Sequence, residues 1–161
     1  MNLCYNGLHI WEKDVRRAMK PENKGLDETL FAYIVKSVSA TPFYDLLGIE
    51  LREIAPGHVK IAVKAEKKHT NPIGLLHGGL IMSLADAAMG NAIRSLGLKG
   101  VTVDCSTSFP GSGKVGSTII AEGSVLRAGK QMIFAESRVF CDEKLIGHTK
   151  ATFFNVGAVE L

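Results

Sequence analysis

Residues 77–96 constrain the fold most, because they combine helical length with side chains that are apolar or small on almost every side. The segment contains no proline, and glycines lie at both of its ends. A helix that is apolar on most sides is usually buried at the centre of a domain. Strands are expected after it at residues 101–109, 117–127, 131–141 and 145–156, with no helix between them. Such a run predicts an antiparallel sheet, which can bury the helix only by wrapping around it.

The region before this helix is expected to add two strands and a helical extension. Hydrophobic and polar residues alternate over residues 58–65, which predicts a half-buried strand, and residues 47–54 form the strand before it. Short helices are expected at residues 10–20 and 26–38, and Pro42 closes the second. We therefore predict an α+β fold with an N-terminal helical extension, residues 1–41, and one domain, residues 42–161.

The composition excludes several classes of protein. Hydrophobic residues make up 46% and charged residues 22%, as in a soluble globular domain. No apolar run approaches the ~18 residues of a membrane span, and the net charge of +3 is too small to indicate nucleic acid. Three scattered cysteines indicate neither a disulfide framework nor a metal site. The N-terminus lacks the order of a signal peptide. We expect a cytoplasmic protein with no metal, membrane or nucleic-acid partner.

Asp86 is the most informative single residue, because it lies inside the most apolar helix. A charged side chain there costs free energy unless it is paired or functional. The alternative is an aspartate on a solvated helix edge, or one bonded to a backbone group. His77, Gly78 and Gly79 open the same helix. Its first amides lack internal partners, so the Gly78 amide can polarise a carbonyl oxygen; the alternative is a glycine-rich turn that only starts the helix.

The spacing of these two features predicts a shared site. Gly78 and Asp86 are eight residues apart, which is roughly 12 Å along a helix axis. One small reacting group cannot touch both in one subunit. If both act on one carbonyl, Asp86 must come from a second copy, and two antiparallel helices related by a two-fold axis do this twice.

The sequence lacks two common functional motifs, a phosphate-binding loop and the nucleophile elbow of serine hydrolases. Gly111-Ser-Gly-Lys114 lacks the spacing of a phosphate-binding loop, and a strand rather than a helix is expected after it. No Gly-x-Ser-x-Gly elbow is present, which argues against a serine hydrolase. Cys105, on an alternating strand, is expected to be a core residue rather than a nucleophile.

The residues Asn-Pro-Ile-Gly-Leu-Leu-His-Gly-Gly at 71–79, followed by Leu-Ala-Asp at 84–86, carry a resemblance. They resemble the signature of hotdog-fold acyl-CoA thioesterases, and the subgroup they resemble most is the phenylacetate-pathway (PaaI-like) enzymes. The resemblance covers residues 42–156. It implies an antiparallel sheet around a central helix, and a homodimer with sheets joined edge to edge, commonly paired again into a homotetramer. It also implies an acyl-CoA substrate, with no cofactor beyond the coenzyme A of that substrate.

The resemblance also implies roles for single residues. Asp86 matches the catalytic carboxylate, and Gly78 matches the helix-start amide that polarises the thioester carbonyl. Asn71 and His77 match residues that orient the substrate or water, and Thr102 lies where a hydroxyl assists the attacking water. The chain departs from the subgroup at Phe109, which is followed directly by proline and a Gly-Ser-Gly-Lys loop. The residues expected to contact the substrate are Gly79, Ser83, Lys114, Arg127, Gly129 and Lys130.

Several alternatives stay open. Asp86 acts as a general base toward water, or attacks the thioester directly to give an anhydride. A module that binds acyl-CoA without turnover is the second class. A hotdog dehydratase or hydratase is the third, although that chemistry relies on a different arrangement of histidine and acid.

Overall fold

The computed structural model describes residues 20–161. The helix expected at residues 10–20 lies outside the described residues, apart from its last position. The elements are β1 (Glu22–Asn23), α1 (Glu28–Ala40), α2 (Pro42–Leu47), β2 (Ile49–Ala55), β3 (His58–Lys64), a 3-10 turn (Lys67–His69), α3 (Gly78–Arg94), β4 (Leu98–Ser108), β5 (Thr118–Ala128), β6 (Met132–Cys141) and β7 (Lys144–Ala158).

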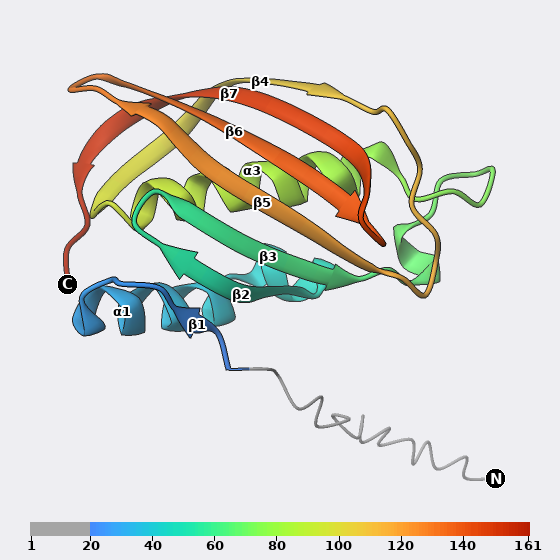
Figure 1. Ribbon diagram of the computed structural model, residues 1–161, viewed down its shortest axis with the longest axis horizontal. Coiled ribbons are helices and arrows are strands. Elements are labelled where there is room, and N and C mark those ends of the chain that lie inside the picture. Colours follow the sequence, from blue (N-terminus) through green and yellow to red (C-terminus); the bar gives the residue numbers. More distant parts are fainter. Residues whose placement is uncertain (1–19) are drawn as a thin grey trace, which may run out of the picture.

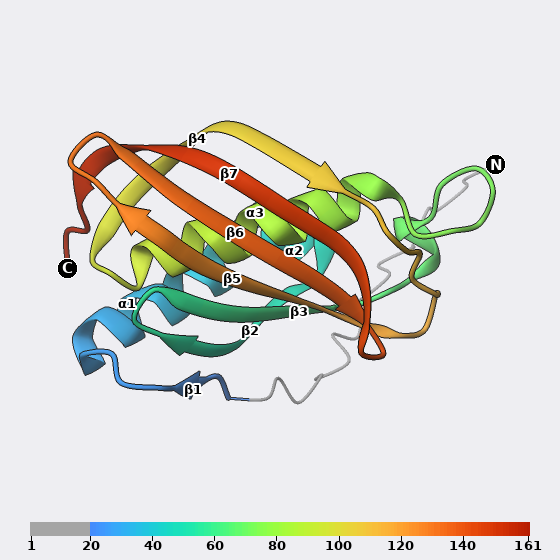
Figure 2. The ribbon, with the colours of Figure 1, turned by 45° about the horizontal axis from the view of Figure 1, so that its top comes forward.

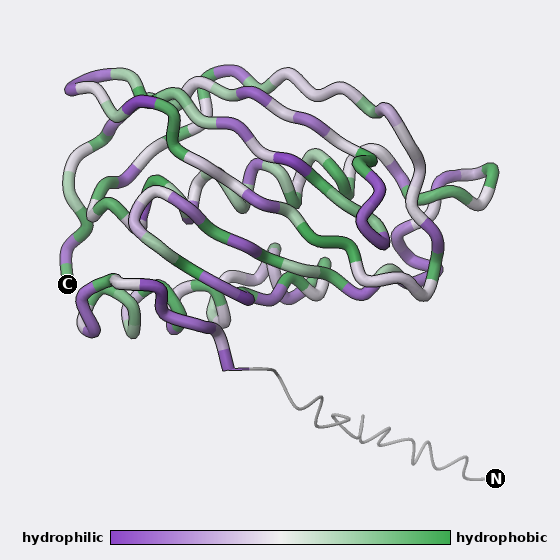
Figure 3. The backbone as a smooth tube through the Cα atoms, in the orientation of Figure 1, coloured by the Kyte–Doolittle hydropathy of each residue, from purple (hydrophilic) through white to green (hydrophobic). Residues whose placement is uncertain are grey.

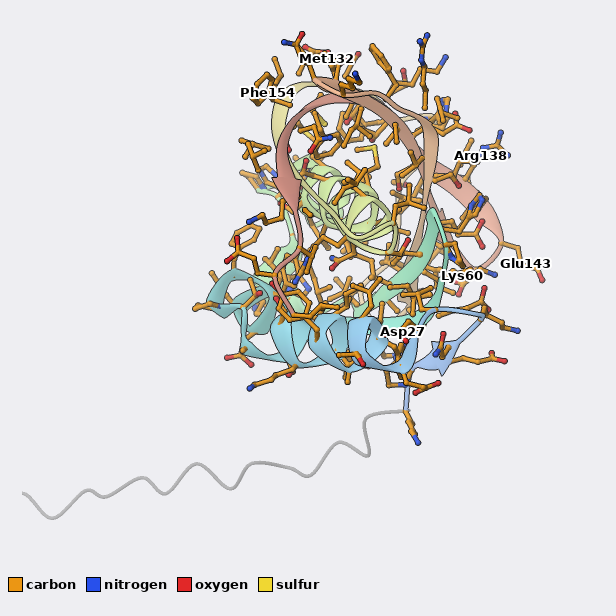
Figure 4. The ribbon with its side chains drawn as sticks, turned by 90° about the vertical axis from the view of Figure 1, so that its left-hand side faces the viewer. Asp27, Lys60, Met132, Arg138, Glu143 and Phe154 are labelled. Carbon is orange, nitrogen blue, oxygen red and sulfur yellow. The ribbon has the colours of Figure 1, made fainter. Side chains whose placement is uncertain are left out.

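A seven-stranded sheet in the order β1-β2-β3-β5-β6-β7-β4 curves around α3 (Figures 1 and 2). All neighbouring strands are antiparallel except β1, which pairs in parallel with β2. Seen nearly along the axis of α3, the sheet covers that helix on the side opposite α1 (Figure 4). The predicted hotdog arrangement is confirmed, with the short parallel strand β1 as an addition.

Helix α3 is buried because its side chains on the sheet side are apolar and small enough for close approach. Leu84, Ala88 and Ile93 have no exposed surface. Opposite them on β5, a Cβ at Gly123 would overlap the backbone of Ala88, so only glycine lets the helix lie this close to the strand. Full burial of one large aliphatic side chain stabilises the fold by roughly 1.5–3 kcal/mol.

The N-terminal segment packs on the same core as the rest of the chain. Asp27 caps α1 by accepting hydrogen bonds from the amides of Thr29 and Leu30, and Ile34 and Val38 join the main cluster of buried residues. The helix predicted at residues 26–38 is therefore confirmed. The boundary predicted after residue 41 falls between α1 and α2, and stays a prediction.

Residues 42–48 differ from the prediction, because they contain a short helix. Pro42 not only follows the end of α1; it also occupies the first turn of α2, which we did not predict. Gly48 ends this helix in a left-handed conformation with φ of 71°. The strand expected from residue 47 therefore begins at Ile49.

The remaining strands are confirmed within a few residues at each end. Buried positions alternate with less buried ones along β6, and hydrophobic and hydrophilic stretches both occur along the sheet (Figure 3). Asp142 and Glu143 join β6 to β7 with positive φ angles of 48° and 65°, as a tight hairpin requires. No helix within residues 20–161 is both long and apolar enough to cross a membrane.

Strand β4 lies at one edge of the sheet and, within residues 20–161, pairs only with β7. Its side chains Val101 and Val103 are 57% and 59% exposed. A long edge strand with exposed valines is a template for pairing with another chain.

Candidate active site

His77 caps the N-terminus of α3. Its Nδ1 atom accepts a hydrogen bond of 2.8 Å from the Gly79 amide, so the neutral ring carries its proton on Nε2. The Gly78 amide has no helical carbonyl four residues before it. The ring of Phe109 lies against Gly78, where an added Cβ would be 3.3 Å from the ring. The helix start therefore offers a backbone donor beside an exposed imidazole.

Asn71 lies in the loop that leads to this helix. Its Oδ1 atom accepts hydrogen bonds from the amides of Ile73 and Leu75, at 3.1 and 3.0 Å. The role of a turn-former therefore accounts for the side-chain oxygen. The Nδ2 group takes no part in these two bonds and is the donor that remains for a substrate.

Asp86 is half-buried and is held from the edge strand. The Thr102 hydroxyl on β4 donates a hydrogen bond of 2.8 Å to its Oδ1 atom. This bond fixes one carboxylate oxygen and leaves Oδ2 for another ligand. The structure thus brings together two residues that the sequence separates by 16 positions.

Two pockets open along the face of α3 that carries Ser83 and Asp86. The first, of about 270 Å³, contains His77, Gly79 and Ser83. The second, of about 350 Å³, contains Asp86 and Thr102. The remaining lining residues are Phe43, Leu47, Lys68, His69, Thr70 and Leu80 in the first pocket, and Tyr33, Tyr44, Gly90, Arg94, Lys99, Gly100 and Phe153 in the second.

The predicted catalytic residues therefore divide into two groups within one chain. His77 belongs to one pocket and Asp86 to the other. The division follows from helix geometry, since Gly78 and Asp86 are about 12 Å apart along the axis. Both pockets nevertheless lie on one helix face, where a second copy of that helix can bring them together.

Burial raises the pKa of two groups near Asp86, of which Tyr44 lines the second pocket and Cys105 does not. Burial, and to a smaller extent the Asp86 carboxylate, raises the pKa of the Tyr44 hydroxyl, although the hydrogen bond from Asn91 lowers it. Burial and then Asp86 raise the pKa of the Cys105 thiol in the same way. Both groups stay protonated at neutral pH, which fits Cys105 as a packing residue rather than a nucleophile. Among the described residues no group of three or more His, Cys, Asp or Glu side chains is placed to hold a metal ion.

A third, open pocket of about 530 Å³ lies at the hairpin between β5 and β6. Arg127, Gly129 and Lys130 line it beside the exposed side chains of Met132 and Phe134. The structure therefore gathers three of the predicted substrate contacts in one place.

Lys114 is not among them. It precedes β5 whereas Lys130 follows that strand, and the 11 residues of β5 span roughly 35 Å. The loop of Lys114 lies at the start of α3, because a Cβ at Gly113 would meet Leu76. The hairpin lies at the other end of the helix, where the amide of Asn155 on β7 bonds Gln131 and the amide of Val159, just after β7, bonds Gly97.

Sequence reasoning identified only Asp86 and Thr102 of the second pocket, and the residues it missed include Tyr33, Tyr44 and Arg94. Arg94 carried a usable signal, since it follows Asp86 by two steps of four residues and so shares its helix face. The tyrosines carried none, because only the docking of α1 and α2 brings them beside Asp86.

Comparison with known proteins decides the family. A model described as "Thioesterase superfamily" matches residues 73–147, and a model of a domain of unknown function matches residues 29–101. Human acyl-coenzyme A thioesterase 13 is 36% identical over 112 residues, which cover 68% of this chain and 80% of that protein. The chain belongs to the hotdog-fold thioesterases. This membership confirms the predicted family and the predicted class of enzyme, a thioester hydrolase.

Solved structures of other proteins superpose on this hotdog thioesterase. The PaaI protein of Escherichia coli superposes with a TM-score of 0.78 at 23% identity, covering 84% of this chain and 99% of that one, and so shows the fold. A hypothetical thioesterase of Streptococcus pneumoniae, solved with coenzyme A, has a TM-score of 0.67 at 26% identity, covering 70% of this chain and 91% of that one.

Proposed function

We propose that this thioesterase hydrolyses acyl-CoA, with the Gly78 amide polarising the thioester carbonyl and Asp86 of the partner subunit activating water. The observation that carries the proposal is the hydrogen bond between Thr102 and Asp86 inside a pocket on the open face of α3. The substrate class is supported by the name of the human relative and by the coenzyme A in the S. pneumoniae structure.

Each step of the reaction has a group to perform it. The carbonyl oxygen accepts a hydrogen bond from the Gly78 amide, and the Nε2 of His77 and the Nδ2 of Asn71 are further donors nearby in sequence. Water bound at Oδ2 of Asp86 loses a proton to that carboxylate as its oxygen attacks the carbonyl carbon. The C–S bond then breaks, and the thiolate of coenzyme A takes up the proton that Asp86 accepted from water. The products are coenzyme A and the free acid.

The roles of Asp86 and Thr102 have a further support. Variants of the S. pneumoniae protein with an aspartate or a threonine changed to alanine have also been solved, and the two changed positions lie 16 residues apart. Asp86 and Thr102 have the same separation.

The proposed dimer follows from two features of the structure. Asp86 lines one pocket of α3, Gly78 lies between His77 and Gly79 of the other, and β4 beside them has a free edge among residues 20–161. Pairing of two β4 edges about a two-fold axis would extend the sheet and set the two helices antiparallel. A dimer of dimers stays a prediction.

A screen of acyl-CoA thioesters with a thiol-reactive dye tests the function. Hydrolysis releases a thiol, so we expect a dye signal with at least one substrate class. A binding module gives calorimetric binding without thiol release. A hydratase changes the absorbance of an enoyl-CoA without releasing thiol. A covalent route through Asp86 would show as a burst of thiol before the steady state.

Phosphate contacts give a second prediction. In the shared arrangement, Lys114 of one subunit and Lys130 of the other lie at the same end of the helix pair, so one coenzyme A can meet both. Changing both to alanine is expected to raise KM about two- to tenfold, because exposed ion pairs contribute little each. Turnover should fall less, since these contacts are remote from the chemistry. Lys150→Ala, on an exposed position of β7, is the matched control; an unchanged KM for the double variant contradicts this path.

A further inference from the structure

The second pocket extends well beyond Asp86. Its floor is the face of α3 formed by Asp86, Gly90 and Arg94, each four residues after the last. Tyr33 from α1 and Tyr44 from α2 also line it. The N-terminal helices therefore line the same pocket as the proposed catalytic carboxylate.

We infer that this pocket receives the acyl group, and that its far end binds an anionic group carried by the acyl chain. The preferred substrates are then acyl-CoA thioesters whose acyl group ends in a carboxylate. This inference rests on the proposed function, because it takes Asp86 as the point where the carbonyl reacts.

The path between the two ends is open at Gly90. A Cβ built on Gly90 meets no atom within 4 Å, so nothing in the described part of the chain requires glycine there. Glycine inside a helix is unfavourable relative to alanine, and this position is half-exposed within the pocket. The missing side chain leaves room above the helix between Asp86 and Arg94, where an acyl chain can lie.

Hydrogen-bond donors gather at the far end. The Arg94 guanidinium lies 5.3 Å from the centroid of the Tyr33 ring, and its Nη1 donates to Oδ1 of Asn91 at 3.3 Å. Side chains on a helix lean toward its N-terminus, which directs Arg94 back over Gly90. The helix dipole alone would favour a positive charge at Arg94, because Arg94 lies in the last turn of α3. It does not explain why the Arg94 side chain contacts Tyr33 and Asn91.

The other polar groups at this end have the same character. Nδ2 of Asn91 donates to the Tyr44 hydroxyl at 3.3 Å, so the hydroxyl proton is left to donate to a ligand. Lys99, at the rim, forms an ion pair of 2.9 Å with Glu160, whose side chain is 91% exposed. Of the described residues that line the pocket, only Asp86 is acidic, and it lies about 12 Å from Arg94 along the helix axis.

The distance between the Asp86 carboxylate and the Arg94 guanidinium indicates which ligand fits the pocket. A reacting carbonyl at Asp86 and a carboxylate at Arg94 match the two ends, because a guanidinium binds a carboxylate with two parallel hydrogen bonds. A phosphate of coenzyme A has the same anionic chemistry. The pantetheine arm, when extended, carries the phosphates farther from the thioester than two turns of helix, so we assign the site to the acyl group.

A pair of substrates of equal chain length tests the inference. Hexanoyl-CoA ends in a methyl group and adipoyl-CoA ends in a carboxylate. For the unmodified enzyme we expect kcat/KM to favour adipoyl-CoA by about ten- to a hundredfold, the value of a hydrogen bond to a charged group. Arg94→Gln should abolish most of this preference by lowering kcat/KM for adipoyl-CoA alone. Arg138→Gln is the matched control, since Arg138 lies on the outer side of the sheet (Figure 4).

Two results would overturn the inference. One is an unmodified enzyme that hydrolyses both substrates equally well. The other is an equal loss on both substrates in Arg94→Gln, which would assign Arg94 to a phosphate or to the fold. Failure of the proposed function is distinct, because Asp86→Asn would then keep its activity on both substrates.

A second variant tests the path of the chain. Gly90→Ala places a methyl group in the pocket, so the ratio of kcat/KM for hexanoyl-CoA to that for acetyl-CoA should fall several-fold. An unchanged ratio would mean that the acyl chain does not pass Gly90, which also overturns the inference.

Discussion

Replacing Asp86 with asparagine is expected to lower kcat by about 100- to 10,000-fold, the usual contribution of a general base. Asparagine keeps the shape of the side chain, and its oxygen can still accept the hydrogen bond of 2.8 Å from Thr102. It cannot accept a proton from water, so the loss should fall on turnover rather than on KM. Steady-state release of thiol from the best acyl-CoA substrate measures the effect.

Asp104→Asn is the matched control for this variant. Asp104 lies on β4 two residues after Thr102, is exposed, and lies outside both pockets of α3. It should keep native turnover, and both variants should keep the unfolding temperature of the native protein to within a few degrees. Near-native turnover in Asp86→Asn would remove Asp86 from the mechanism.

Mixing two inactive variants is expected to restore activity. The first is Asp86→Asn, and the second is Gly78→Leu, whose side chain would displace the ring of Phe109 from the helix start. In a shared site, a mixed dimer contains one site with both defects and one with neither. After random reassociation of equal amounts, half of the dimers are mixed, so about a quarter of native activity should return.

The mixing experiment needs proof that subunits exchange. Different affinity tags on the two variants allow mixed dimers to be purified, and each variant taken alone through dissociation and reassociation gives the background. Mixed dimers without activity would show that each site is built from a single chain. That result would contradict the shared site without touching the role of Asp86 itself.

The central part of the fold could be predicted because its signals are local and long. The apolar segment at 77–96 became α3, and the strands after it formed the sheet around that helix. Asp86 stood out because burial of a charge on such a helix needs a reason. Its hydrogen bond to Thr102 agrees with the resemblance, whereas the catalytic roles themselves stay predictions.

The N-terminal part could not be predicted to the same degree. Strand β1 has two residues and α2 has six, too few for a periodic pattern to appear. The contribution of Tyr33 and Tyr44 to the pocket depends on how α1 and α2 dock against α3, which no local pattern specifies. The distance between Lys114 and Lys130, by contrast, was already contained in the strand expected at residues 117–127, which β5 matches in length.

The edge strand β4 links the activity of the protein to its solubility. It holds Thr102 against Asp86 and also presents two valines along a bare edge. In the proposed dimer, dilution below the dissociation constant would by mass action silence every site and expose an aggregation-prone strand at the same time. Loss of catalysis and loss of solubility would then be a single event, so substitutions that weaken the association would lower abundance and specific activity together.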